Sequence, residues 1–130
     1  MEEYTEIFKG LSDETRLRIV HLLIAAGKEL CCCEITDSLG ESQYNISRHL
    51  KVLKNAALVK DRKEGRWVYS NIANNGDAFK KILFEAVSSL PKTEKLKEDE
   101  RNLRKRLRLR EDGKCVFGIR KGHLVRKRKD

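Results

Sequence analysis

The sequence predicts a mainly α-helical fold with a β-hairpin wing, a winged helix-turn-helix. Two observations predict it. Two helical patterns meet at Gly40-Glu41-Ser42, a short turn of the kind that joins the helices of a helix-turn-helix. The spacing of apolar residues then changes from helical to alternating near Leu58, and it becomes helical again from Asp77.

The first part of the chain divides into helices by its apolar spacing and its capping residues. Ser12 is placed to cap a second helix that follows a short first one, and Gly27 is placed to end it. A third helix is expected from about Cys32 to Leu39. The apolar positions that define the first two helices are Tyr4, Ile7, Phe8 and Leu11, then Leu17, Val20, Leu23 and Ile24.

A fourth helix and a hairpin follow the turn. Ser42 is placed to cap this helix, and Ile46, Leu50 and Leu53 give it a buried face. Strands are expected at 58–62 and 66–72, with the basic turn 63–65 between them. Trp67 and Tyr69 alternate on the second strand, and we expect them to pack the wing against the body.

A fifth helix runs from Asp77 until Pro91 ends it, and its apolar face is broad. The earlier helices already fill a small core, so the simplest cover for this face is the same face of a second subunit. The sequence therefore predicts a homodimer. The expected interface residues are Tyr4, Phe8, Phe79, Ile82, Leu83, Ala86, Val87 and Leu90.

We expect two regions, a DNA-binding and dimerisation domain at 1–90 and a basic C-terminal extension at 91–130. Leu96, Leu103 and Leu107 lie on one side of a possible helix at 93–110. Asp112-Gly113 is a good hairpin turn, with strands expected on either side. The last residues, 123–130, are expected to be disordered.

Charge is unevenly distributed along the 130 residues, which carry a formal net charge of +9. Residues 101–130 contain 13 Lys and Arg against 3 Asp and Glu, a net of +10, so the other 100 residues have a net of −1. A polyanion such as DNA suits this extension, although a solvated tail would have the same composition.

The sequence has neither a secretory signal nor a membrane-spanning apolar run, so we expect a cytoplasmic protein with reduced thiols.

The fourth helix is expected to read double-stranded DNA from the major groove, with its N-terminal residues towards the bases. Gln and Asn side chains pair with adenine and Arg pairs with guanine, whereas Ser, His and Lys suit phosphates. Three basic residues of the wing are placed to meet the neighbouring DNA backbone or minor groove. His49 could contact a phosphate, or it could equally be a half-buried, hydrogen-bonded residue. The predicted DNA-binding residues are Ser42, Gln43, Tyr44, Asn45, Ser47, Arg48, His49, Lys51, Arg62, Lys63 and Arg66.

Four segments in this order resemble the ArsR/SmtB family of metal-sensing winged-helix repressors. They are FKGLSDETRLR (8–18), ELCCCEI (29–35), SQYNISRHL (42–50) and GRWVY (65–69). The match covers about residues 4–90. It implies a homodimer that occupies a palindromic operator and is released from it by an inducer.

Three consecutive cysteines, Cys31, Cys32 and Cys33, begin the third helix, and thiolates are the ligands that soft ions prefer. On an ideal helix the first and third side chains would point roughly 200° apart. We therefore expect that they share an ion only if the first helical turn opens, which would shift the reading helix. Alternatively, the cysteines are apolar filler in the core.

Cys31 and Cys33 align with the paired cysteines of the family's arsenic- and antimony-responsive branch. The resemblance implies an arsenic(III) or antimony(III) inducer held by three thiolates. Some members of the branch have a third cysteine where this chain has Thr36. Here the third ligand would be Cys115, which we favour, or Cys32, or a small thiol from solution.

Other inducers and functions remain open at this point. Cadmium or lead could bind the same thiolates. The resemblance implies that a zinc sensor would use histidines on the last dimer helix, and zinc is disfavoured because 77–90 contains no histidine. Thiol oxidation is a further possibility. The sequence has no Cys-x-x-Cys, phosphate loop or His-Glu-x-x-His, so an enzyme is not expected. A thiol reductase, a metal chaperone and a non-specific architectural DNA binder are weaker alternatives.

Overall fold

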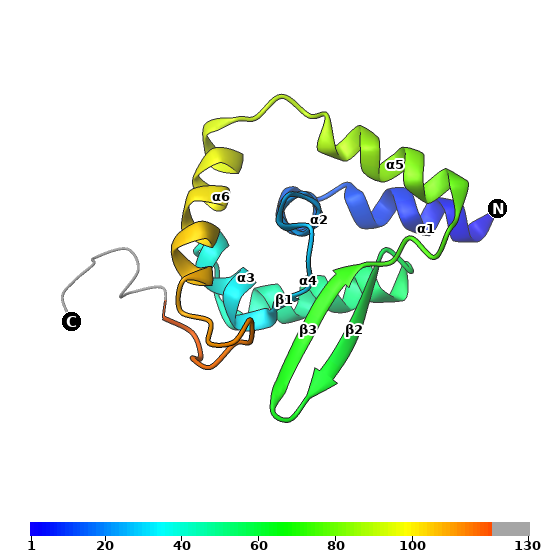
Figure 1. Ribbon diagram of the computed structural model, residues 1–130. Coiled ribbons are helices and arrows are strands. Elements are labelled where there is room, and N and C mark those ends of the chain that lie inside the picture. Colours follow the sequence, from blue (N-terminus) through cyan, green and yellow to red (C-terminus); the bar gives the residue numbers. More distant parts are fainter. Residues whose placement is uncertain (121–130) are drawn as a thin grey trace.

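The computed structural model describes residues 1–120, and the predicted disorder at 123–130 lies outside this part (Figure 1). The chain is mainly helical with one small sheet, and the predicted winged helix-turn-helix is confirmed. The helices are α1 (Glu2–Leu11), α2 (Glu14–Ala26), α3 (Cys32–Leu39), α4 (Gln43–Asn55), α5 (Ala78–Ser88) and α6 (Glu94–Leu107). The strands are β1 (Leu30–Cys31), β2 (Val59–Glu64) and β3 (Trp67–Ile72).

Helix boundaries follow the capping residues, with one correction. The predicted cap of α2 at Ser12 is wrong: Asp13 takes the extended cap conformation, and its carboxylate accepts the Arg16 N–H at 3.0 Å. Ser12 instead ends α1, where its hydroxyl donates to a carbonyl of that helix. Ser42 caps α4 as predicted, because its hydroxyl accepts the Asn45 N–H at 3.1 Å.

The core is built around α2, which contacts α1, α4, α5 and α6. Burial therefore extends beyond the predicted stripe: Ile19 and Leu22 are fully buried, whereas Leu17 and Ile24 are only partly so. A helix with neighbours on several sides has no single apolar face. The predicted buried face of α4, by contrast, is confirmed.

The sheet is antiparallel with strand order β1-β3-β2, and the two-residue β1 was not predicted. Its Cys31 lies opposite Tyr69 of β3. The wing is the hairpin β2–β3, which projects from the helices in Figure 1. Its turn is Gly65-Arg66 and not the predicted 63–65, because Glu64 pairs with Trp67 and Gly65 takes a φ of +61°.

Helices α1 and α5 lie together at one end of the molecule (Figure 1). The Phe79 ring contacts those of Tyr4 and Phe8, with centroids 5.6 and 6.0 Å apart. Tyr4, Phe8 and Ile82 are exposed, as is Ala86. Phe79, Leu83 and Leu90 are half-buried, and Val87 lies in the core of its own chain.

Helix α6 lies at the opposite side, against α2 and α3 (Figure 1). The segment that follows, residues 108–120, is called the C-terminal arm below. Around Asp112-Gly113 it forms one isolated bridge between Glu111 and Lys114, and the flanking strands predicted there are not formed in the part described. None of the helices within residues 1–120 is long and apolar enough to span a bilayer.

Candidate metal centre and nucleic-acid interface

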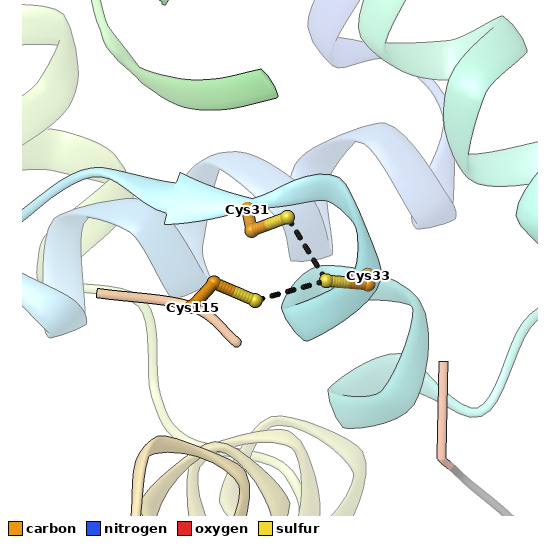
Figure 2. A group of neighbouring side chains, drawn as sticks. All are labelled: Cys31, Cys33 and Cys115. Carbon is orange, nitrogen blue, oxygen red and sulfur yellow. Dashed lines mark hydrogen bonds between the residues drawn. The ribbon is translucent and has the colours of Figure 1, made fainter. Parts of the chain in front are cut away.

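Three buried cysteines from two distant parts of the chain meet at the start of α3. The Sγ atom of Cys33 lies 2.9 Å from that of Cys31 and 3.3 Å from that of Cys115 (Figure 2). All three sulfur atoms lie within 4.8 Å of one another. Three thiols at this spacing are a suitable ligand set for one soft ion.

The predicted conflict between Cys31 and Cys33 is wrong. Cys31 is the last residue of β1 and the N-cap of α3, and its backbone is extended, with φ −70° and ψ 148°. Only Cys33 lies within the helix. The two sulfur atoms therefore meet without any opening of the first turn. The separation of roughly 200° expected on an ideal helix does not arise, because the two residues do not belong to one continuous helix.

The backbone around the thiols is held by polar groups, of which only Tyr69 was predicted to be structurally important, as a packing residue of the wing. The N–H of Cys31 donates to Glu34 Oε1 at 2.9 Å. Arg110 donates to both carboxylate oxygens of Glu34, each at 2.8 Å. The N–H of Cys115 donates to the Tyr69 hydroxyl at 3.0 Å. One signal was available, because a carboxylate three residues after a helix cap is the capping-box pattern.

Cys32 is not part of this cluster. Its Sγ lies 3.7 Å from the hydroxyl oxygen of Ser47 on α4. Thr36, where some relatives were expected to have a cysteine, donates its hydroxyl to the Cys32 carbonyl. Of the two candidates within the chain for a third thiol, the structure thus brings Cys115 to Cys31 and Cys33 and leaves Cys32 facing α4.

The three thiols have different pKa values because they lie close to one another and are buried. The hydrogen bond from the Cys33 thiol lowers the pKa of Cys31 to about 6. The same hydrogen bond raises the pKa of Cys33 far above its usual range, and burial raises the pKa of Cys115. Cys31 is therefore the thiol of the three that loses its proton most readily. A bound ion would have to displace the remaining protons.

Arg106, fully buried on α6, lies beside the cluster. Its Nε donates to Asp37 at 2.6 Å, and its Nη2 donates to the carbonyls of Phe117 and Gly118 at 2.6 and 2.9 Å. Its Nη1 has no hydrogen-bond partner among the described residues. Burial opposes the charge, but the hydrogen bond to Asp37 and the electrostatic effect of Cys33 raise the pKa of Arg106.

The N-terminal half of α4 forms an exposed polar face. Tyr44 is 75% exposed, and Asn45 is half-buried between Glu41 and Arg48. The remaining exposed side chains of this face are Ser42, Gln43, Ser47, Arg48 and Lys51. A face of this kind has the donors and acceptors needed to contact base edges and phosphates.

Two further predicted DNA-binding residues also have partners within the chain. His49 is 6% exposed, and its Nδ1 lies 3.1 Å from Arg16 Nη1. It is therefore the packed, hydrogen-bonded residue of the two alternatives and not an exposed phosphate contact. Arg62 pairs with Glu29 and Glu64 at the side of the wing. Lys63 and Arg66 are exposed at the end of the hairpin.

Comparison with known proteins gives consistent results. The sequence profile of the arsR family of bacterial regulatory proteins matches residues 13–61. The arsenical resistance operon repressor of Escherichia coli is 46% identical over 82 residues, which is 62% of this chain and 69% of that repressor.

Two further relatives differ in the element to which their names assign resistance, arsenic or cadmium. The arsenic resistance transcriptional regulator ArsR2 of Pseudomonas putida is 52% identical over 64 residues, covering 49% of this chain. A cadmium resistance regulatory protein CadC homolog of Staphylococcus aureus is 40% identical over 70 residues, covering 54% of this chain. The chain spans little more than half of each relative's length, 55% and 57%.

A solved structure supports the fold assignment. The homodimeric winged helix-turn-helix DNA-binding domain Mb0332 of Mycobacterium bovis, described as a possible ArsR-family regulator, superposes with a TM-score of 0.57. It is 30% identical, and the match covers 67% of this chain and 79% of that domain.

Proposed function

The chain belongs to the ArsR family of bacterial regulatory proteins, and from this premise we propose that it is an arsenic(III)-released repressor acting in the cytoplasm. In this proposal a homodimer binds operator DNA until the ion occupies Cys31, Cys33 and Cys115. The observation that carries the proposal is the convergence of these three sulfur atoms within 4.8 Å.

Trivalent arsenic suits the cluster for a chemical reason. Arsenous acid reacts with three thiols to form three As–S bonds and three water molecules, so the product carries no net charge. An uncharged product is favourable in a site whose three side chains are at most 8% exposed, because burying a net charge is costly. Antimony(III) has the same chemistry.

The exposed face of α4 and the wing support DNA binding. Gln43 and Arg48 have the side-chain chemistry to contact base edges, and Lys51 suits a phosphate. Lys63 and Arg66 lie at the end of the wing, where the neighbouring DNA backbone would be in reach. Pairing two chains through α1 and α5 would give a symmetric reader for a palindromic site.

A divalent soft ion such as cadmium or lead is a second candidate, and Arg106 favours it. Three thiolates with a divalent ion carry one net negative charge. The buried guanidinium, whose Nη1 has no hydrogen-bond partner among the described residues, would partly compensate that charge. The CadC homolog supports the same alternative by its name.

The proposal is tested by fluorescence anisotropy of the reduced protein on DNA from upstream of its own gene. Arsenite, antimonite, cadmium and zinc are titrated into the complex. We expect arsenite to release the DNA, and Cys31→Ser, Cys33→Ser and Cys115→Ser each to abolish release. Cys32→Ser is the matched control and should be released normally. Release by cadmium but not arsenite would favour the second candidate, and release by neither would contradict both.

A further inference from the structure

A hollow lies between α4 and the wing, and the C-terminal arm reaches its edge. The arm arrives there from the thiol cluster, since only two residues separate Cys115 from Gly118. The hollow is lined by Gln43 and Ser47 of α4, Arg66 and Trp67 of the wing, and Gly118 and Ile119 of the arm. The arm therefore borders the same hollow as part of the face that we propose for DNA binding.

The end of the arm is held in this place by polar contacts. Arg106 donates to the carbonyls of Phe117 and Gly118, and the Arg120 N–H donates to both carboxylate oxygens of Asp37 at 2.8 Å. Asp37 also accepts from Arg106, so the arm is attached to α3 and α6 at one point.

Apolar packing contributes little to this attachment. Cys115 is 1% exposed, but Phe117 and Ile119 are 37% and 39% exposed. A segment with few buried apolar contacts opens at a lower free energy than the fold as a whole. The end of the arm, residues 118–120, thus has the properties of a segment with a docked and an open state.

We propose that the C-terminal arm is the segment through which the thiol site controls DNA binding. An ion bound through Cys115 fixes residues 118–120 at the hollow, and the fixed arm competes with DNA for it. Ile119 is apolar and cannot replace the polar contacts that a phosphate needs, so a docked arm excludes DNA rather than extending the interface. Arg106 is a positioning residue for the docked arm.

This inference rests on the proposed function and adds its mechanism. The ion stabilises the docked arm, whereas DNA requires the open one. By thermodynamic linkage each ligand then lowers the affinity of the other by the same factor. Without the ion, the weakly packed end of the arm, residues 118–120, opens and the complete face of α4 becomes available.

Two truncations that end after Arg120 and after Phe117 test the inference. Both keep Cys115 and lack the basic residues 121–130, so they differ only in Gly118, Ile119 and Arg120. DNA release by arsenite is measured by anisotropy, and arsenite binding to each protein is measured by calorimetry. We expect the chain ending at Arg120 to be released like the full chain. The chain ending at Phe117 should still bind arsenite. The factor by which arsenite lowers its DNA affinity should be at least about tenfold smaller than in the full chain.

The outcomes separate the inference from the function on which it rests. Equal release of both truncations would overturn the role of the arm and leave the arsenite-released repressor intact. Weaker DNA binding by the Phe117 truncation without arsenite would also overturn it, because the arm would then be a DNA contact. A full chain that arsenite does not release would contradict the proposed function itself. As a second variant, Ile119→Ala should weaken release in the same direction while leaving arsenite affinity unchanged.

Discussion

At the scale of single residues, the position of Cys31 just outside a helix makes the thiol site possible. Its extended backbone brings its sulfur within 2.9 Å of that of Cys33, two residues along the chain. Tyr69 then places the third thiol, because its hydroxyl accepts the Cys115 N–H and its own backbone pairs with Cys31 across the sheet.

Replacing this hydroxyl should weaken ion binding without removing a sulfur ligand. We expect Tyr69→Phe to lower arsenite affinity by about tenfold, the usual effect of losing a residue that orients a ligand. DNA affinity without arsenite should not change. Calorimetry measures the first and anisotropy the second, with Tyr44→Phe on the exposed face of α4 as the control for arsenite binding. Unchanged arsenite affinity in Tyr69→Phe would mean that the arm is positioned by other contacts.

His49 makes stability depend on pH. Burial lowers the pKa of His49 from its ordinary 6.5, with Asp13 acting in the opposite direction. The folded state therefore favours the neutral ring, and its stability is complete above about pH 6.5 and declines as the pH falls below that value. Urea unfolding at pH 7.5 and 5.5 should show this loss in the native chain and a smaller one in His49→Gln. An equal loss in both would assign the pH dependence to other groups.

At the scale of elements, buried ion pairs attach α6 and the arm to α2 and to the helix-turn-helix. Arg18 of α2 donates to both oxygens of Asp99 at 2.9 and 2.8 Å, and Arg106 and Arg110 bind carboxylates of α3. Such pairs fix geometry more than they add stability, because each charge loses its hydration. Breaking one is costly, since its partner stays buried.

We expect Asp99→Ala to destabilise the fold by about 3 kcal/mol, because it leaves the buried Arg18 without its main partner. Glu94→Ala, in the first turn of the same helix, removes an exposed carboxylate and should cost well under 1 kcal/mol, in keeping with about 0–1 kcal/mol for a surface pair. Urea denaturation of both variants at pH 7.5 measures the difference. Equal midpoints would show that the Arg18–Asp99 pair does not hold α6.

At the scale of the whole molecule, the thiol site lies within one chain while the proposed DNA reader needs two. All three sulfur ligands come from one chain, whereas the exposed Tyr4, Phe8 and Ile82 belong to the face predicted to contact a partner. Dimerisation and ion binding should therefore be separable.

Ile82→Glu places a charge on this face at a side chain that is 64% exposed in the single chain. We expect a monomer by sedimentation and at least about tenfold weaker DNA binding, because the second half-site contact is lost. Arsenite affinity should stay the same. Lys81→Gln, next to it on α5, lowers the net charge by the same one unit and is the matched control. A dimeric Ile82→Glu protein would place the interface elsewhere.

The sequence by itself determined the local features. Helical spacing, the Ser42 cap, the turn at Gly40 and the change of period at the wing involve residues a few positions apart, and they correctly predicted the helix-turn-helix, the wing and the buried face of α4. Two local predictions were wrong by one or two residues. The cap of α2 is Asp13 and not the adjacent Ser12, and the turn of the wing is Gly65-Arg66 and not 63–65.

Only the tertiary structure decided how the thiols meet. The two-residue β1 exists because β3, about 40 residues later, pairs with it, and this pairing takes Cys31 out of the helix. Cys115 approaches Cys33 across 82 positions in the chain, held by buried Arg–carboxylate pairs. In the sequence these arginines cannot be told apart from the exposed basic residues around them. Their partners are set by the packing of α6 on α3, which no local pattern encodes.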